Sequence, residues 1–302
     1  MAATNISRSS NNPLIRANDF NNRKCSIQDV PVLQKADRVN VMNILVLSDL
    51  HICNGDRLDT FKWEARAFIK KLEYIRATYS IDQVILNGDI YELCKYSLKE
   101  ITRKNTLLVN YFEVINAIYI KGNHDIGHPN GLSYYLIINS KGRRIRIEHG
   151  HKADFLNGTR PGRIVGHSFF KMLKACACMP FAVRLYFGRL LKNEGISHER
   201  TYNFYTYLRY AVRLLKCDDV VILGHTHSLE VHTTYSGNDT KLYLNSGSCS
   251  FGRFQGMILD TETLRYQPIN GSTSPAAHKP VHIPRLIHSV KQHESIQNCV
   301  AV

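Results

Sequence analysis

The chain has 302 residues, enough for one large domain with a sizeable core. Its hydrophobic content of 44% is that of an ordinary globular protein, and no stretch approaches the roughly 20 apolar residues that cross a bilayer. The formal charge of +14, from 39 Lys and Arg against 25 Asp and Glu, favours anionic partners such as phosphate esters, nucleic acid or acidic membranes. The first residues have no apolar export signal and the eight cysteines form no Cys-x-x-Cys pair, so we expect reduced thiols and a cytoplasmic location.

The two ends of the chain are polar and differ in composition from its middle. Residues 1–38 are rich in Asn, Ser, Arg and Lys and lack periodicity, which predicts a flexible N-terminal arm. Residues 271–302 are polar and His-rich, which predicts a flexible C-terminal tail, and Cys299 stands at the position that prenylation would use. We therefore expect a single domain over residues 39–270.

The first half of this domain alternates apolar runs with helical periodicity. Residues 59–78 carry apolar side chains at steps of three and four, which predicts a helix capped by Asp59 or Thr60. Ser97 and Glu100 form a capping-box pattern that predicts the start of another helix. The order β-α-β-α-β favours parallel strands, because crossover helices join strands of one direction. The expected strands are residues 41–48, 81–87 and 117–121.

The second half has a different pattern. Residues 134–139 and 144–148 flank a turn and predict a hairpin. Residues 156–217 have helical periodicity and predict an inserted lid. Further short strands suggest a second sheet packed on the first; they are residues 219–223, 229–234, 241–245, 255–260 and 264–267.

Five polar clusters each follow an expected strand. They offer carboxylate, amide and imidazole groups, a mixture that suits divalent manganese, iron, zinc, cobalt or nickel. The ligands are too many for one ion, and two ions need a shared anionic bridge, for which Asp89 is the natural candidate. The clusters are Asp49-x-His51, Gly88-Asp89, Gly122-Asn123-His124-Asp125, His149-Gly-His151 and Gly224-His225-Thr-His227.

In this order the clusters resemble the motifs of the calcineurin-like metallophosphoesterase superfamily. The resemblance covers residues 41–250 and implies an α/β fold, a four-layer α/β/β/α sandwich with two metal ions, of which manganese is the first expectation. It also implies hydrolysis of a phosphate ester by metal-activated water.

The resemblance assigns a role to each matching residue. His124 would act on the leaving group or the scissile phosphate, and Asp125 would orient it. Glu92 is expected to support the site rather than to bind metal. One ion would bind Asp49, His51, Asp89 and His227, and the other would bind Asp89, Asn123, His149 and His225.

Within the superfamily, the layout resembles the UDP-2,3-diacylglucosamine diphosphatase group. The likeness lies in Gly88-Asp-Ile-Tyr-Glu92, in residues 148–154 and in the helical insertion; that group typically has Arg where this chain has His124. Residues 156–217 hold eleven basic and two acidic residues among apolar ones, which suits a lipid phosphate, a membrane surface or, as the weaker alternative, nucleic acid. We expect substrate contacts from His151, Arg163 and Arg200.

We therefore expect a hydrolase that cleaves a phosphodiester or pyrophosphate bond of a lipid- or nucleotide-linked substrate, either in the cytoplasm or peripherally on a membrane. One alternative is a nuclease or phosphomonoesterase of the same superfamily. Another is a scaffold that uses the fold only for binding, although an intact ligand set argues against it.

Overall fold

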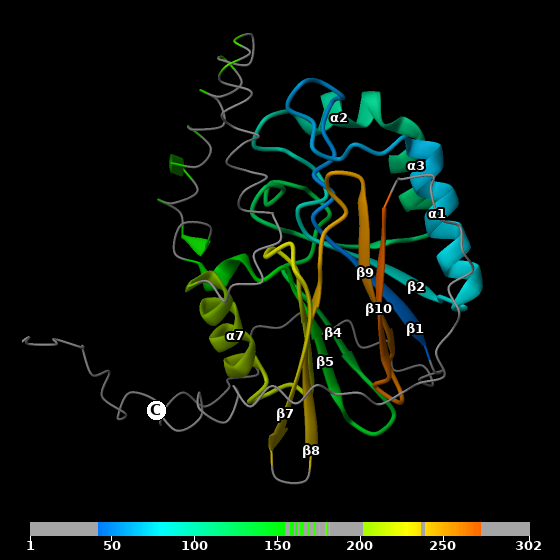
Figure 1. The fold of residues 1–302 in the computed structure, drawn as a ribbon, viewed down its shortest axis with the longest axis vertical. Helices are drawn as coiled ribbons and strands as arrows, with labels where there is room; N and C mark the ends of the chain where they lie inside the picture. Colours follow the sequence, from blue (N-terminus) through cyan, green and yellow to red (C-terminus); the bar gives the residue numbers. More distant parts are fainter. Residues whose placement is uncertain are drawn as a thin grey trace, which may run out of the picture. The chain divides into compact units, whose positions relative to one another are not determined.

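The computed structural model describes residues 42–154, single positions between 158 and 181, and residues 202–236 and 239–272. These residues form two five-stranded mixed sheets with helices beside them (Figure 1). The order of the first sheet is β10-β9-β1-β2-β3, and that of the second is β4-β5-β6-β8-β7. The predicted α/β class with two sheets is confirmed.

The first sheet holds the three strands that precede the first three polar clusters. β1 pairs in parallel with β2, β2 pairs in parallel with β3, and β9 runs antiparallel to β1. The carboxyl ends of β1, β2 and β3 therefore lie at one edge of the sheet. The strands are β1 (Asn43–Leu47), β2 (Gln83–Asn87), β3 (Ile118–Ile120), β9 (Arg253–Asp260) and β10 (Tyr266–Ser272).

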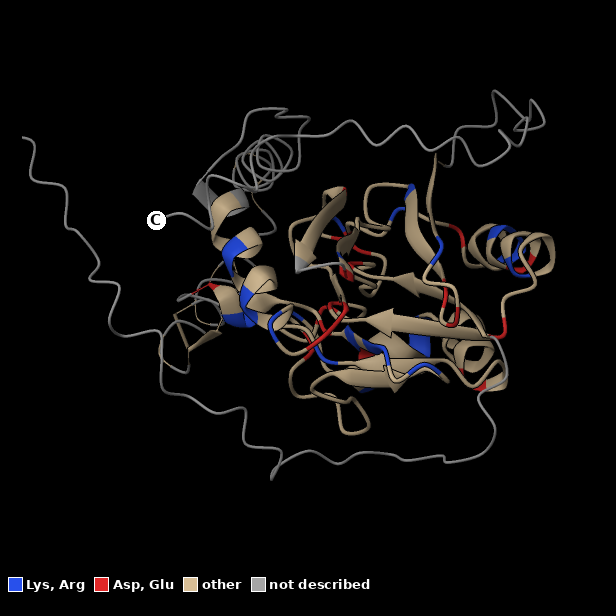
Figure 2. Cartoon of the chain, turned by 90° about the horizontal axis from the view of Figure 1, so that it is seen from below, with Lys and Arg blue, Asp and Glu red and all other residues tan. Residues whose placement is uncertain are grey.

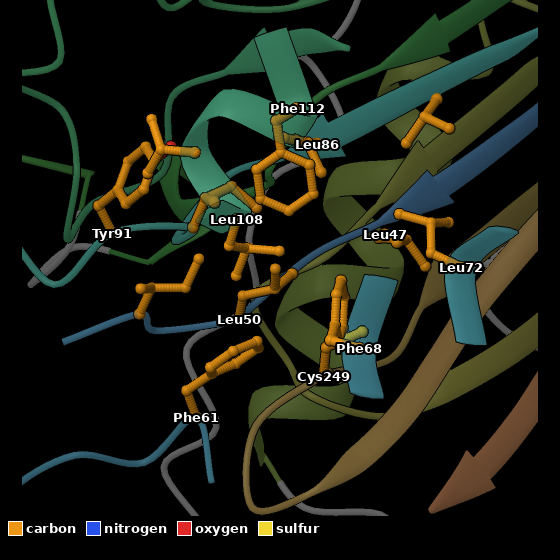
Figure 3. Close-up of a cluster of buried hydrophobic side chains, with 14 of the residues drawn as sticks. Leu47, Leu50, Phe61, Phe68, Leu72, Leu86, Tyr91, Leu108, Phe112 and Cys249 are labelled. Carbon is orange, nitrogen blue, oxygen red and sulfur yellow. The ribbon is translucent and has the colours of Figure 1, made fainter. Parts of the chain in front are cut away.

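Three helices bury their apolar faces on this sheet: α1 (Ala65–Thr78), α2 (Leu98–Lys104) and α3 (Thr106–Val114). Figure 3 shows Phe68 of α1 and Phe112 of α3 in one buried cluster with Leu47 of β1 and Leu86 of β2. The capping box predicted at the start of α2 is confirmed.

The predicted start of α1 was wrong. Glu64 caps the helix, with its carboxylate accepting hydrogen bonds from the backbone N–H groups of Arg66 and Ala67. Asp59 instead accepts hydrogen bonds from Gly55 and Phe61 in the preceding loop. The carboxylate of Asp59 stabilises a turn there, a role that Asp fills as readily as capping.

The second sheet continues the parallel pairing from β5 through β6 to β8. On its outer face, α7 (Tyr202–Leu214) and the residue that follows it pack Leu208, Ala211 and Leu215 against Val221 and Tyr243. The strands are β4 (Tyr135–Ile138), β5 (Arg144–Ile147), β6 (Val220–Leu223), β7 (Leu229–Ser236) and β8 (Asp239–Ser246), with the 3₁₀ helix η3 (His151–Ala153) after β5.

A separate core lies between the two sheets. It joins Val46 and Ile85 of the first sheet to Ile145, Ile222 and Leu244 of the second, all fully buried. Burial of each such side chain contributes about 1.5–3 kcal/mol, so this layer holds the two sheets together. With the helices on the outer faces, the described residues form the four layers α/β/β/α.

The predicted helical lid over residues 156–217 is not evident as a unit. In that range α7 is the helix whose bounds the structure defines, and Arg163 and Arg200 lie outside the described residues. The expected arm, most of the expected tail and Cys299 also lie outside them, while β10 extends to Ser272, beyond the predicted boundary at residue 270. Within the described part of the chain, none of the helices has the length and apolar character needed to cross a membrane.

Candidate metal centre

The polar clusters meet where the carboxyl ends of β1, β2 and β3 lie opposite those of β5 and β6. The first sheet places Asp49 and His51 after β1, Asp89 after β2, and Asn123 and His124 after β3. The second sheet places its own group opposite them. This group is His149 after β5, with His225 and His227 after β6.

Backbone pairing continues beyond β1 and β2 into the loops that carry the first side chains. The N–H of Asp49 donates to the carbonyl of Gly88 over 3.0 Å, and the N–H of His51 donates to that of Asp89 over 2.9 Å. The hydroxyl of Ser248 donates to the carbonyl of Asp49 over 3.1 Å. The two loops therefore form one unit.

Five residues at this edge have a left-handed backbone. The φ values are 54° at Asp49, 50° at His51, 52° at Asp89, 68° at His225 and 57° at His227. This conformation costs roughly 1–2 kcal/mol for a residue with a side chain, and such strain collects at functional sites. All five are predicted metal ligands, so the strained backbone conformation serves to orient their side chains.

Two glycines leave the room that these side chains occupy. A Cβ on Gly122 would lie 2.0 Å from Oδ1 of Asp89, and a Cβ on Gly88 would lie 2.5 Å from the ring of His149. Gly88 also has a φ of +82°. A larger residue at either position would displace a predicted ligand.

The first group consists of Asp49, His51 and His227. Oδ1 of Asp49 lies 3.0 Å from Nε2 of His227 and 3.8 Å from Nε2 of His51. The two Nε2 atoms lie 3.3 Å apart. Three potential ligand atoms therefore converge on one point.

The second group consists of Asp89, His149 and His225. Nε2 of His149 lies 3.2 Å from Oδ2 of Asp89 and 3.2 Å from Nδ1 of His225. Asn123 precedes His124, whose N–H donates to Oδ1 of Asp89 over 2.8 Å. The loop after β3 that carries Asn123 is thus hydrogen-bonded to Asp89.

These separations fit metal ligands. Two atoms bound about 2.1 Å from one ion lie roughly 3.0–3.4 Å apart at right or tetrahedral angles. Oδ1 of Asp49 is buried and makes no hydrogen bond, although Nε2 of His227 is only 3.0 Å away. A carboxylate oxygen and an imidazole nitrogen at that distance without hydrogen-bond geometry fit a shared cation.

The charges of the groups favour cations as well. Burial raises the pKa of Asp89, but His149 and His124 outweigh it and hold that pKa well below its usual range. Asp49 is also buried, and its pKa is likewise lowered, chiefly by His227 against the effect of burial. Burial lowers the pKa of His225 to about 3, with His149 adding to the shift, so its imidazole is neutral and able to bind metal.

The role predicted for Asp125, to orient His124, stays a prediction. The carboxylate of Asp125 faces the backbone, where it accepts hydrogen bonds from the N–H groups of Ile90 and Gly122 over 2.7 and 2.6 Å. The hydroxyl of Tyr119 also donates to it. Asp125 therefore ties the loop after β3 to the loop after β2.

Glu92 contacts two imidazoles of the site. Its Oε1 lies 2.5 Å from Nδ1 of His124, and its Oε2 lies 3.3 Å from Nδ1 of His51. Nζ of Lys95, whose side chain is fully buried, lies 3.4 Å from Oε2. Glu92 thus supports the site, as predicted, but its contact with His124 could not be recognised from its spacing alone.

The helix α7 adds an aromatic residue beside the second ligand group. The ring of Tyr207 is buried and lies 5.4 Å from the ring of His225. The backbones of α7 and η3 are neighbours, and η3 carries the buried His151. The sequence of α7 contains Arg209 and Arg213, and Figure 2 colours basic positions along the ribbon of the chain in blue.

The model of one protein family, described as calcineurin-like phosphoesterase, matches residues 42–229 of the chain. No curated protein sequence matches the chain significantly. Among solved structures, an archaeal phosphodiesterase is similar at 19% identity and a TM-score of 0.38, over 76% of this chain and all (100%) of its own. Vacuolar Protein Sorting 29 from Cryptosporidium parvum is similar at 17% identity and a TM-score of 0.35, over 78% of this chain and 98% of its own. A dimetal phosphatase from Danio rerio is similar at 10% identity and a TM-score of 0.42, over 77% of this chain and 99% of its own.

Proposed function

The chain belongs to the calcineurin-like phosphoesterase family, and we propose that its two ligand groups each hold one divalent ion of a phosphoester-hydrolysing centre. The first ion would be bound by Asp49, His51, Asp89 and His227. The second would be bound by Asp89, Asn123, His149 and His225. Manganese is the first candidate, because this mixture of carboxylate, amide and imidazole suits it, with iron, zinc, cobalt and nickel as alternatives.

The position of Asp89 carries this proposal. One ligand atom of Asp89 lies within 4.8 Å of atoms of His51 and His124, and one also lies within 4.8 Å of atoms of His149 and His225. A single buried carboxylate thus stands between the two ligand groups. This is the arrangement that a pair of bridged ions requires, since each cation gains from the shared negative charge.

The bound ions would supply charge neutralisation at the phosphoryl oxygens and a water of lowered pKa. The chain itself supplies a proton donor. Nε2 of His124 lies 3.9 Å from Oδ2 of Asp89, so this nitrogen faces the centre, while Nδ1 faces Glu92. Burial lowers the pKa of His124, but Glu92 and Asp89 outweigh it and raise the pKa to about 9. His124 can therefore hold a proton for the leaving oxygen as a general acid.

Glu92 keeps His124 in this orientation. A carboxylate on Nδ1 fixes the ring and leaves Nε2 as the nitrogen that meets substrate. Lys95 counters the charge of Glu92 from the buried side, which allows one carboxylate to contact two imidazoles, His51 and His124. Glu92 and Lys95 act through His124 and are positioning residues.

For the substrate, we propose a phosphodiester or pyrophosphate that is linked to a lipid or a nucleotide. The eleven basic residues among residues 156–217 support an anionic substrate. Exposed apolar side chains at Ile164, Val165, Met172 and Phe181 of the same segment support a lipid part, which would bring the protein to a membrane surface. His151, with Arg163 and Arg200, remains the proposed source of substrate contacts.

The resemblance to the UDP-2,3-diacylglucosamine diphosphatase group supports a nucleotide-linked lipid. The His at position 124, in place of Arg, supports a more general phosphodiester instead. Hydrolysis of a nucleotide-diphospho-lipid set against that of a single-stranded oligonucleotide would separate this proposal from a nuclease. Bis-p-nitrophenyl phosphate set against p-nitrophenyl phosphate would separate a diesterase from a monoesterase.

The proposal is tested by Mn²⁺-dependent hydrolysis of bis-p-nitrophenyl phosphate in the full chain and in Asp89→Ala. We expect the variant to lose activity, because both ions would lose a ligand. Asp239→Ala is the matched control: this side chain is mostly exposed and pairs with Arg143 at the far end of β8, so little change is expected. Full activity of Asp89→Ala would refute the proposal, and metal binding without hydrolysis of any ester would favour a binding scaffold.

A further inference from the structure

A third group of ligand atoms lies beside the centre, on the far side of His124 from Asp89. Atoms of Glu92, Cys94 and His124 all lie within 4.8 Å of one another. Glu92 and Cys94 stand in the turn after the second motif, and Sγ of Cys94 also lies 3.7 Å from the backbone carbonyl of His124. The turn therefore brings a thiol to the two residues that hold the proposed proton donor.

These three side chains have the chemistry of a site for a thiophilic cation. Thiolate, imidazole and carboxylate are the three ligand types of zinc in proteins, with bonds of about 2.0–2.3 Å. Neither of the two groups assigned to the catalytic ions contains sulfur. Hard ions such as Mn²⁺ prefer oxygen and nitrogen, so the sulfur distinguishes this group from the other two.

The surroundings of Cys94 favour a cation over a bare thiolate. Burial and the negative charges of Glu92, Asp89 and Asp125 raise the pKa of the Cys94 thiol, and the positive charge of Lys95 opposes them. The side chain of Cys94 is of intermediate exposure. On binding, the thiol proton of Cys94 and the Nδ1 proton of His124 would pass to solvent.

We propose that Glu92, Cys94 and His124 form an inhibitory site for Zn²⁺ or a similar thiophilic cation. The binding part of this proposal is independent of catalysis, whereas the inhibition rests on the proposed function. An ion in this site occupies Glu92 and His124 together. It takes from His124 the carboxylate contact on Nδ1, which is 2.5 Å long in its absence. The proton donor then loses its partner, and hydrolysis slows.

Binding is measured first, without reference to activity. Cd²⁺ is titrated into the full chain whose catalytic sites have been filled with Mn²⁺, and the ultraviolet charge-transfer band of a cadmium thiolate is followed. The control is Cys217→Ser, which removes an exposed thiol at the end of the segment after α7. We expect a saturable band in the wild type and in Cys217→Ser, and its loss in Cys94→Ser. A band unchanged in Cys94→Ser would overturn the site.

A second measurement needs no variant. Zn²⁺ should protect Cys94 of the wild-type protein from alkylation by iodoacetamide, read by mass spectrometry of the peptide, while Cys217 stays reactive. Equal alkylation of Cys94 with and without Zn²⁺ would also overturn the site. This result stands even if Cys94→Ser fails to fold.

Inhibition is measured last, on Mn²⁺-loaded protein with bis-p-nitrophenyl phosphate. Added Zn²⁺ should inhibit the wild type and Cys217→Ser, and Cys94→Ser should need a higher Zn²⁺ concentration for the same fractional loss of its own activity. Equal sensitivity of Cys94→Ser would overturn the inhibitory role. If no hydrolysis is found in any variant, the proposed function fails, but the cadmium band and the alkylation still decide whether the cation binds.

Discussion

The two sheets contribute different chemistry to one centre. The first sheet carries both carboxylates, Asp49 and Asp89, on loops that are hydrogen-bonded to each other. The second sheet adds imidazoles alone, from His149, His225 and His227. Each ligand group takes members from both sheets, so neither sheet holds a complete site. The centre is therefore a product of how the sheets pack, and not of either motif set alone.

The difference also explains how two buried acids are tolerated. Asp49 and Asp89 are almost wholly inaccessible, and the like charge of Asp89 acts with burial to raise the pKa of Asp49. The imidazoles of the second sheet offset that repulsion. Divalent ions would offset it far more strongly, because a buried charge is stable only when it is paired.

Among variants that leave all the proposed metal ligands in place, the largest effect on rate is expected at His124, which the first sheet carries. Without a general acid, His124→Ala should hydrolyse an ester with a poor leaving group about 10²–10⁴-fold more slowly. Bis-p-nitrophenyl phosphate should suffer much less, because its leaving group needs no proton. Glu92→Gln should show a smaller loss of rate, again larger for the ester with the poor leaving group. Equal losses on both substrates would show that His124 has another role.

A substitution at Gly122 should disturb the ligands carried by the first sheet without removing any functional group. The added Cβ in Gly122→Ala would meet Oδ1 of Asp89 at 2.0 Å and displace it. A displacement of about 1 Å costs about 10²-fold in activity when it moves a catalytic group. Gly127→Ala, in the same loop, would meet nothing within 4 Å and serves as the control. Equal activities of the two variants, assayed side by side, would contradict the placement of Asp89.

Chelation should weaken the connection between the sheets. At free metal 1,000 times above the dissociation constant, binding stabilises a folded protein by about 4 kcal/mol. For a domain of this size that corresponds to a drop in Tm of about 8 °C or more when EDTA is added. Asp89→Ala, lacking the shared ligand, should show a much smaller drop. A wild-type Tm that is unaffected by EDTA would show that the ions do not join the two sheets.

The smallest effect is expected where α7 meets the second sheet. The hydroxyl of Tyr210 donates to Oε1 of Glu148 over 2.5 Å, next to His149. Tyr210→Phe should lower the free energy of unfolding by about 1.5 kcal/mol, the usual value for such a bond to a carboxylate. Urea denaturation would measure it. A loss of phosphoesterase activity larger than the loss of stability explains would give α7 a direct part in catalysis.

The sequence predicted which residues lie at the edge, because apolar strands that end in Asp, His or Asn are visible as runs. It also predicted the alternation of strands and helices that brings those ends together. The sequence could not predict which way the loop side chains point. Asp125 is adjacent to His124 in sequence, yet its side chain turns to the backbone of the neighbouring loop, and the more distant Glu92 reaches the imidazole. Adjacency in sequence does not determine which way a loop side chain points.

The cap of α1 was missed for a similar reason. Asp59 and Glu64 are both suitable caps, and only the path of the intervening loop, held by Phe61 in the core, decides between them. The contact of Tyr207 with His225 depends on how α7 packs against the second sheet, and no periodicity contains that information.

The most direct test of the central claim is the metal content of purified protein, measured by mass spectrometry after Mn²⁺ loading and desalting. The wild type should hold about two ions per chain and His227→Ala about one, because His227 belongs to the first group alone. Asp89→Ala should hold close to none, since both ions would lose the shared carboxylate. If Asp89→Ala keeps as much metal as His227→Ala or more, Asp89 does not bridge two ions and the account is wrong.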